Sequence, residues 1–242
     1  MKISLVIPCH KPYIKYLDKI IDDVCLQTYK PIECILSISE IDEQIYLELK
    51  NKYEKKLELN KINFIIIWDT KRRNAGPNRN SGADKAKGDY ISFIDADDLM
   101  SPYRLEVINY ILEKKKPNLL LHGYFKNLID SFPKINIKSL DNKTIDNDII
   151  KNLTYPKGFI RNREREILQA KKPMLKIPAE TYHHGAVTVK KEVFKNIRYT
   201  TAIRGQDSIF CRDVLEKLGG LIYINEKLMS YTIKDLVVDH QN

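Results

Sequence analysis

The chain of 242 residues is poor in cysteine and glycine and lacks long apolar runs. Its four cysteines are scattered without Cys-x-x-Cys spacing, which argues against a zinc site or a disulfide framework. The longest apolar stretches, such as residues 64–68, are far shorter than the roughly 20 residues that span a bilayer. A strand-like segment, Ile3–Ile7, begins almost at once. We therefore expect no signal peptide, no transmembrane segment and a cytoplasmic location.

Glycine-rich phosphate loops are also missing. No Gly-x-Gly-x-x-Gly follows a predicted strand, which excludes the usual dinucleotide-binding oxidoreductases. The first predicted strand ends in residues 8–11 (Pro-Cys-His-Lys), without glycine. A sugar-phosphate nucleotidyltransferase needs a glycine-rich, basic loop there to hold a triphosphate, so this class is disfavoured.

Acidic residues are too few to balance the basic ones, and the net charge is +9. Lysines make up most of the excess of basic residues, and most of them are explained as ordinary solvent-exposed surface residues. Attraction to anionic substrates or to membrane headgroups stays open, so peripheral membrane contact is one alternative. Basic and aromatic residues do not alternate as in nucleic-acid platforms, and we expect no nucleic-acid partner. Nothing in the sequence indicates an oligomeric state.

The first half of the chain alternates strand and helix patterns. This order predicts an α/β fold with a doubly wound, mostly parallel sheet flanked by helices. The expected strands cover residues 2–7, 32–38, 62–68 and 90–94, and the expected helices cover 16–27, 43–57 and 78–86.

The second half is less regular. A helix over 103–113 and a strand over 119–124 precede a polar, lysine-rich stretch, 126–180, without clear periodicity. Order returns with a strand over 186–190, a helix over 208–218 and a strand over 221–224. We expect one domain, 1–242, with the acceptor-binding elements in the irregular region.

Three carboxylates, Asp95, Asp97 and Asp98, follow the buried strand predicted over 90–94. Ligands of open α/β sheets bind at the carboxyl ends of strands. Clustered carboxylates repel one another unless a cation neutralises them. The Asp run therefore predicts a site for a divalent metal bound with a polyphosphate.

Several motifs occur in a characteristic order, and together they resemble the inverting glycosyltransferases of family 2, which have the GT-A fold. The resemblance is dense over residues 1–105 and looser over 183–235. The motifs are Val6-Ile7-Pro8-Cys9-His10, Gln27-Thr28-Tyr29-Lys30-Pro31-Ile32-Glu33, Asn74-Ala75-Gly76-Pro77-Asn78-Arg79-Asn80-Ser81-Gly82-Ala83, Asp95-Ala96-Asp97-Asp98 and Gly205-Gln206-Asp207.

The resemblance implies a nucleotide-sugar donor, most often UDP-linked, and Mn²⁺ or Mg²⁺ as cofactor. Asp97 would contact the metal, and Asp95 would contact the ribose or the metal shell. Asp207 would be the general base, although an Asp at a helix start also suits an N-cap. His240 would be a further metal ligand.

The other donor-binding residues implied by the resemblance are Pro8, His10, Ser39, Arg79 and Ala96. For Arg79, a salt bridge to a neighbouring carboxylate is the competing interpretation. Residues 1–105 would form the nucleotide-sugar-binding half and residues 106–242 the acceptor-binding half.

One family feature is absent. The second strand usually ends in Asp-Asp-Gly-Ser, whose first Asp recognises the base, whereas this chain has Ser37-Ile38-Ser39-Glu40. Ser39 or Glu40 is left to replace that carboxylate. The loss also motivates a second hypothesis, a catalytically degenerate sugar-nucleotide-binding domain.

The transmembrane helices and the Gln-x-x-Arg-Trp motif of processive polysaccharide synthases are missing, which favours transfer of a single sugar. The acceptor hydroxyl remains open between a glycan, a lipid-linked sugar and a protein side chain.

Overall fold

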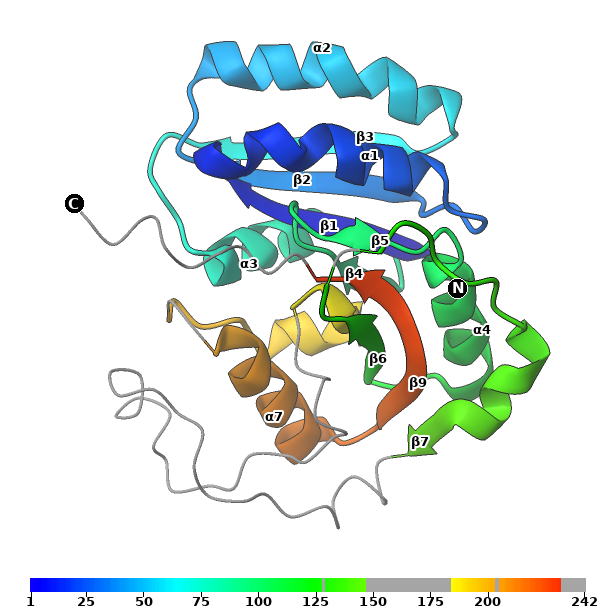
Figure 1. The fold of residues 1–242 in the computed structure, drawn as a ribbon. Helices are drawn as coiled ribbons and strands as arrows, with labels where there is room; N and C mark the ends of the chain where they lie inside the picture. Colours follow the sequence, from blue (N-terminus) through cyan, green and yellow to red (C-terminus); the bar gives the residue numbers. More distant parts are fainter. Residues whose placement is uncertain (128, 147–183, 203–204, 232–242) are drawn as a thin grey trace.

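The computed structural model describes residues 1–127, 129–146, 184–202 and 205–231, and within them the core is a nine-stranded mixed sheet (Figure 1). The strand order is β3-β2-β1-β4-β8-β6-β9-β5, and β7 pairs with β9. The strands are β1 (Ile3–His10), β2 (Glu33–Ser39), β3 (Asn63–Asp69), β4 (Tyr90–Phe93), β5 (Leu99–Met100), β6 (Leu119–Phe125), β7 (Thr144–Asp146), β8 (Val187–Lys190) and β9 (Leu221–Ser230).

Helices connect and flank these strands. The α-helices are α1 (Leu17–Cys25), α2 (Glu43–Leu59), α3 (Ala75–Lys85), α4 (Arg104–Lys115) and α7 (Gln206–Leu218). Four short 3₁₀ segments add η1 (Lys11–Tyr16), η2 (Ile137–Lys143), η3 (His184–Ala186) and η4 (Lys191–Lys195) to the described residues.

The parallel part of the sheet has the alternating strand and helix topology expected from the sequence. Strands β3, β2, β1 and β4 are parallel neighbours, whereas β8 runs antiparallel to both β4 and β6. In the register, His10 pairs with Ser39 and Ser39 pairs with Asp69. Strands β1, β2 and β3 therefore end at the same level, and their last side chains share one edge. The predicted α/β fold with a sheet flanked by helices is confirmed, but the sheet as a whole is mixed, because β5, β7 and β8 pair antiparallel with their neighbours.

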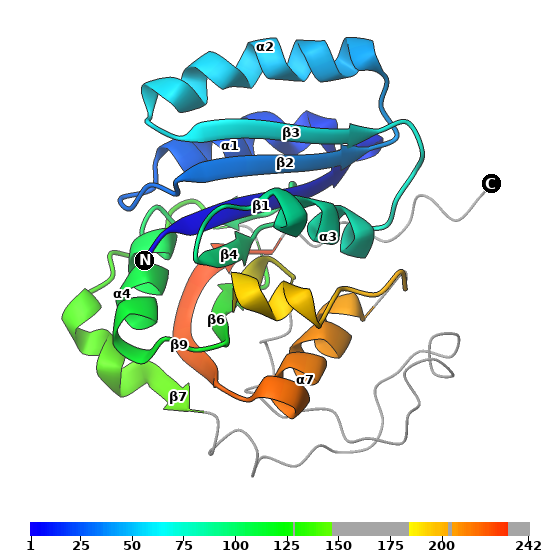
Figure 2. The same cartoon turned by 180° about the vertical axis from the view of Figure 1, so that it is seen from behind.

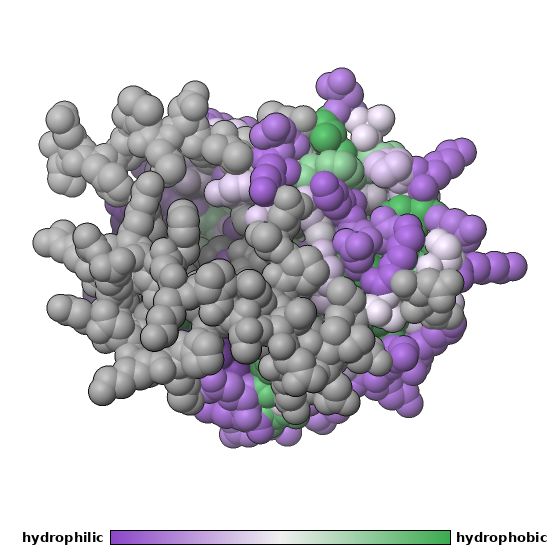
Figure 3. Space-filling model, turned by 60° about the horizontal axis from the view of Figure 1, so that its bottom comes forward, coloured by the Kyte–Doolittle hydropathy of each residue, from purple (hydrophilic) through white to green (hydrophobic). Residues whose placement is uncertain are grey.

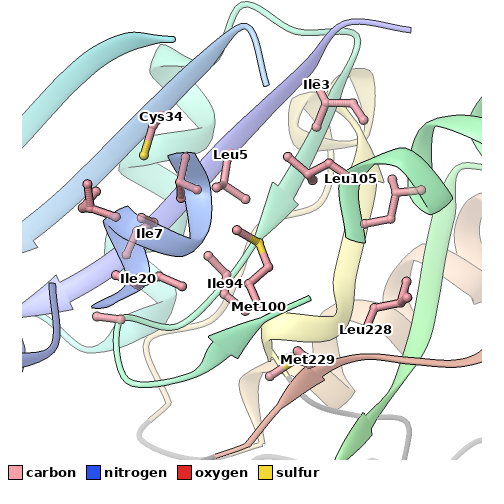
Figure 4. Close-up of a cluster of buried hydrophobic side chains, with 14 of the residues drawn as sticks. Ile3, Leu5, Ile7, Ile20, Cys34, Ile94, Met100, Leu105, Leu228 and Met229 are labelled. Atoms are coloured by element: carbon pink, nitrogen blue, oxygen red, sulfur yellow. The ribbon is translucent and has the colours of Figure 1, made fainter. Parts of the chain in front are cut away.

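Two apolar clusters hold helices against the two faces of the sheet. One packs α1, α2 and α4 against the strands, and the close-up in Figure 4 shows part of it around Ile7, Ile20 and Met100. The other lies on the opposite face, where Figure 2 shows α3 and α7 in front of the sheet. Because both faces are covered, β1 is almost entirely buried, as strands in parallel sheets usually are.

Strand β1 was expected to end at Pro8, and this boundary is wrong because the strand continues to His10. Proline lacks an N–H and usually interrupts a ladder. The Val6 carbonyl accepts from Ile94 on the β4 side, and alternate residues face the same neighbour. Pro8 therefore faces the β4 side beyond the last β1–β4 pair, Val6 with Phe93, so no ladder bond is lost.

Strand β9 was expected to stop at Ile224, but it runs to Ser230. The polar residues Asn225, Glu226 and Lys227 interrupt the apolar pattern of the sequence there. In the structure the β6–β9 register shifts around Gly123, and the strand continues past this irregularity. Strands β5 and β7 were not predicted, because they have only two and three residues.

Exposed large apolar side chains are scattered rather than clustered among the described residues, on the end of α1, α2, β3 and α7. Figure 3 shows one face, where hydrophilic residues surround small hydrophobic areas wherever the surface is coloured. No helix in the described ranges combines the length and the apolar character needed to cross a bilayer.

The contact between α3 and β1 yields a stability prediction. A Cβ at Gly82 would overlap a methyl group of buried Val6. Gly82→Ala should therefore lower the free energy of unfolding by about 1–3 kcal/mol, although alanine normally favours a helix. Urea unfolding measures the change. Val6→Ala removes the overlapping methyl group, so the double variant should be more stable than the sum of the single effects. Strict additivity would contradict the close contact.

Candidate active site

The ends of β1 and β2 are joined by one side chain from α3. Asn78 is buried, and its amide donates to the Cys9 carbonyl (2.7 Å) and to Ser39 Oγ (3.1 Å). Ser39 Oγ also accepts from the Arg73 backbone N–H (3.2 Å). Ser39 thus lies at the predicted site, but it is fully buried and its hydroxyl has protein partners. Its contact with a nucleotide stays a prediction.

The end of β1 places the next two predicted residues. Pro8 is buried within the strand, and His10 is partly exposed at its last position. The His10 ring lies 4.4 Å from the Tyr13 ring, centroid to centroid. His10 therefore lines the same sheet edge as Ser39.

The Asp run forms a tight turn between β4 and β5. The Asp98 N–H donates to the Asp95 carbonyl (3.2 Å), Ala96 is buried, and Asp95 and Asp97 are partly exposed. Asp98 is buried and lies so close to Gly185 that an added Cβ would sit 3.0 Å from its Oδ2. The run thus divides into two carboxylates that reach the surface and one that faces the interior.

A buried arginine, which the sequence analysis did not single out, anchors this turn. Arg104 donates to the carbonyls of Phe93 (2.9 Å) and Gly185 (2.7 Å) and to His122 Nε2 (2.9 Å). Burial lowers the Arg104 pKa to about 9, and nearby Asp98 opposes the shift. Since Phe93 ends β4, Arg104 fixes the strand from which the Asp turn begins.

Arg79 makes the salt bridge that the sequence left as an alternative. Its Nη2 donates to Asp95 Oδ1, and its side chain is fully buried. Within the part of the chain that the structure describes, Nε and Nη1 have no hydrogen-bond partner. The guanidinium carbon lies 5.5 Å from the centre of the Tyr199 ring, within cation–π range.

Tyr199 connects the Asp turn with the start of α7. Its ring stacks on Phe210 (4.1 Å, 9° between planes) and meets Phe93 edge-on (5.5 Å, 82°). Burial raises the pKa of Tyr199 well above its usual value, Arg79 opposes the shift, and the carboxylates of Asp207 and Asp95 add to it. Residues from distant parts of the sequence thus converge on this ring.

Asp207 lies in the first turn of α7, and only 8% of it is exposed. The alternative role as N-cap is wrong, because the cap position is Gly205, in a left-handed conformation with φ 74°. Asp207 Oδ1 accepts from the Ser208 N–H (2.8 Å). The first turn is also the end of a helix where the dipole interacts favourably with an acidic side chain.

With the Asp turn, Arg79 and Asp207 brought together, comparison with known proteins decides the family. The profile of glycosyl transferase family 2 matches residues 4–197. The chain belongs to this family. An uncharacterized glycosyltransferase of Methanocaldococcus jannaschii is 24% identical over 182 residues, which cover 67% of this chain and 61% of that protein. The chain therefore spans less than two thirds of that relative.

Similar solved structures confirm the predicted GT-A-like fold. The 1–349 chain of S. aureus TarS, in complex with UDP-GlcNAc, superimposes with a TM-score of 0.65 at 15% identity, over 97% of this chain and 59% of that one. The mannosyltransferase PcManGT from Pyrobaculum calidifontis, in complex with GDP-Man and Mn²⁺, has a TM-score of 0.60 at 15% identity, over 98% and 58% of the two chains.

The donor set suits a metal that is completed by substrate. Among the described residues, no group of three or more His, Cys, Asp or Glu side chains could hold a metal ion. Mg²⁺ sites commonly use one or two carboxylates together with substrate phosphates, and the hard oxygens of Asp95 and Asp97 fit that pattern. This pair would hold the ion at the turn between β4 and β5.

His240 and its neighbours lie outside the described residues, so its role as a metal ligand stays a prediction. The chain leads toward it from Tyr231, directly after β9. Burial raises the pKa of Tyr231, and the carboxylates of Asp98, Asp97 and Asp95 add to the shift. Strand β9 therefore ends beside the Asp turn.

The Arg79–Asp95 pair generates a stability prediction. Asp95→Asn leaves a fully buried guanidinium without its carboxylate, so the free energy of unfolding should fall by about 2–4 kcal/mol. Asp97→Asn is the matched control, because Asp97 lies in the same turn and is partly exposed, and it should cost less than about 1 kcal/mol. Equal losses in urea unfolding would contradict the structural role of Asp95.

Proposed function

We propose that this protein is a metal-dependent, inverting glycosyltransferase that moves one sugar from a nucleotide-sugar donor, UDP-linked by preference, to an acceptor hydroxyl. The observation that carries the proposal is that Arg79, Asp95 and Asp207 all lie near the buried ring of Tyr199 in a chain of family 2. It brings a candidate metal-binding turn and a candidate base to the same buried centre.

The donor would lie across the aligned strand ends. The nucleotide would occupy the edge formed by β1, β2 and β3, and its diphosphate would reach the turn at Asp95 and Asp97. When bound, Mn²⁺ or Mg²⁺ stabilises negative charge on the departing diphosphate. The complexes of TarS with UDP-GlcNAc and of PcManGT with GDP-Man and Mn²⁺ support a donor of this class.

Asp207 would accept the proton of the acceptor hydroxyl as that oxygen attacks the anomeric carbon. Inversion in a single displacement needs only one such carboxylate, on the side opposite the leaving group. The Ser208 N–H, which donates to Asp207 Oδ1, would orient the base without supplying a proton itself.

The acceptor is a glycan, a lipid-linked sugar or a protein side chain, and the positive net charge is compatible with contact to an anionic membrane surface. A degenerate domain that binds sugar nucleotides without turnover is the alternative. Donor hydrolysis measured with and without Mn²⁺ separates the two, because only the enzyme releases free sugar and nucleoside diphosphate.

Asp97→Asn tests the metal site. We expect Mn²⁺-dependent nucleotide binding to weaken by at least the roughly 10–100-fold that loss of an outer-shell partner costs at metal sites, and sugar transfer to fall with it. Calorimetric titration of UDP with and without Mn²⁺ gives the affinity. A variant with unchanged Mn²⁺ dependence and full transfer activity would remove Asp97 from the site.

Asp207→Asn tests the base. Turnover should drop by roughly 10²–10⁴-fold while donor affinity stays within about twofold, because a positioned base acts on the transition state. Asp213→Asn, on the same helix, is the control and should keep full activity. Collapse of donor binding in Asp207→Asn would show that this carboxylate holds the nucleotide instead.

A further inference from the structure

Helix α3 is attached to the segment that leads toward α7 (Figure 2). Residues 197–202 of this segment belong to neither a helix nor a strand, so their backbone groups need partners from elsewhere in the chain. Asn80 of α3 donates through Nδ2 to the Tyr199 carbonyl (2.9 Å) and accepts the Tyr199 N–H at Oδ1 (3.0 Å). One side-chain amide thus holds both backbone groups of Tyr199.

The first turn of α3 holds the next residues of the same segment. Asn74 donates through Nδ2 to the Thr201 carbonyl (3.0 Å). A Cβ at Gly76 would lie 2.3 Å from the Thr200 carbonyl oxygen, so only glycine allows the two backbones to approach this closely. Asn74, Gly76 and Asn80 belong to the motif over residues 74–83, and in this structure all three contact the backbone of the segment before α7.

The position of Asp207 depends on this attachment. The Tyr199 ring stacks on Phe210 with 4.1 Å between the ring centres and 9° between the planes. Phe210 lies one turn after Asp207 in α7. Loss of the Asn80 amide would release the backbone that carries the Tyr199 ring, and Asp207 would shift together with α7.

We propose that Asn80 is a positioning residue for the base: through Tyr199 it fixes the start of α7, so that Asp207 faces the acceptor hydroxyl. The proposal rests on the proposed function, since it takes Asp207 to be the base. Arg79, the neighbour of Asn80 in the sequence, pairs with Asp95, so consecutive residues of α3 hold the Asp turn and the base. A displacement of about 1 Å in a reacting group can cost roughly 10²-fold in rate.

Asn80→Ala removes both hydrogen bonds and tests the proposal. The assay is hydrolysis of UDP-GlcNAc, UDP-glucose, UDP-galactose and GDP-Man with Mn²⁺, in which water takes the place of the acceptor hydroxyl. For the donor that the wild type hydrolyses fastest, kcat should fall by about 10–100-fold. KM and the calorimetric affinity for UDP with Mn²⁺ should stay within about threefold, because the proposed donor contacts lie at β1, β2 and the Asp turn.

A double-mutant cycle with Asp207→Asn distinguishes positioning of the base from a general structural role. If Asn80 acts through Asp207, removing it from the Asp207→Asn variant should lower kcat by less than about threefold further, since residues that act as a unit are not additive. An equal fold-loss of kcat in both backgrounds would show that Asn80 does not act through the base, and would overturn the proposal.

Asn118→Ala is the matched control, because Asn118 holds the opposite end of α7. Its Nδ2 donates to the carbonyls of Leu218 and Gly219 (both 3.3 Å). Both alanine variants should lower Tm by about 2–8 °C, but only Asn80→Ala should lose kcat. An equal loss of kcat in Asn118→Ala would assign the effect to weakened packing of α7 and contradict the proposal.

The outcomes separate two failures. If Asp207→Asn shows its expected loss while Asn80→Ala keeps kcat within about threefold of the wild type, positioning by Asn80 is wrong and the proposed function stands. If the wild type hydrolyses none of the four donors with Mn²⁺, or if Asp207→Asn keeps full turnover, the proposed function fails in its base, and positioning by Asn80 fails with it.

Discussion

A guanidinium with no exposed surface needs a carboxylate beside it, and Arg79 finds one in Asp95. The pair fixes the turn after β4, because moving Asp95 would leave a buried charge alone. The same guanidinium lies over the ring of Tyr199, which in turn stacks on Phe210 of α7. The position of Asp207, one turn before Phe210, therefore depends on the pairing of Arg79 with Asp95. One buried ion pair thus sets the spacing between two carboxylates that come from distant parts of the chain.

The other half of the site relies on neutral hydrogen bonds. Asn78 ties the ends of β1 and β2 together, and the strand register brings β3 to the same level. Helix α3 supplies both Asn78 and Arg79, so its packing against β1 aligns the ends of β1 and β2 with the Asp turn. Gly82, which has no side chain, allows α3 to pack this close to Val6 of β1. A small shift of this helix would disturb both halves together.

The sequence predicted the parallel strands β1 to β4 and the Asp turn, because apolar periodicity and motif spacing are local signals. It did not predict the roles of Tyr199 and Arg104, since nothing in a linear pattern shows that a tyrosine or an arginine will be fully buried against distant carboxylates. The length of β9 was missed for a related reason. Its polar interruption at Asn225–Lys227 reads as a strand end, and only pairing with β6 carries the strand across it. The competing roles of Arg79 and Asp207 likewise needed the partners and the helix start seen in the structure.

The contact between Arg104 and His122 has a consequence for where one proton resides. Arg104 Nε can only donate, so His122 Nε2 must accept and carries no hydrogen. The imidazole proton therefore sits on Nδ1, where it points to the Gly123 carbonyl (2.8 Å). This histidine is a fixed tautomer in the fold, and a second proton on its ring would face the guanidinium directly. Arg104 holds the Asp turn through the carbonyls of Phe93 and Gly185. Its third hydrogen bond, to His122, requires that the imidazole carry only one proton.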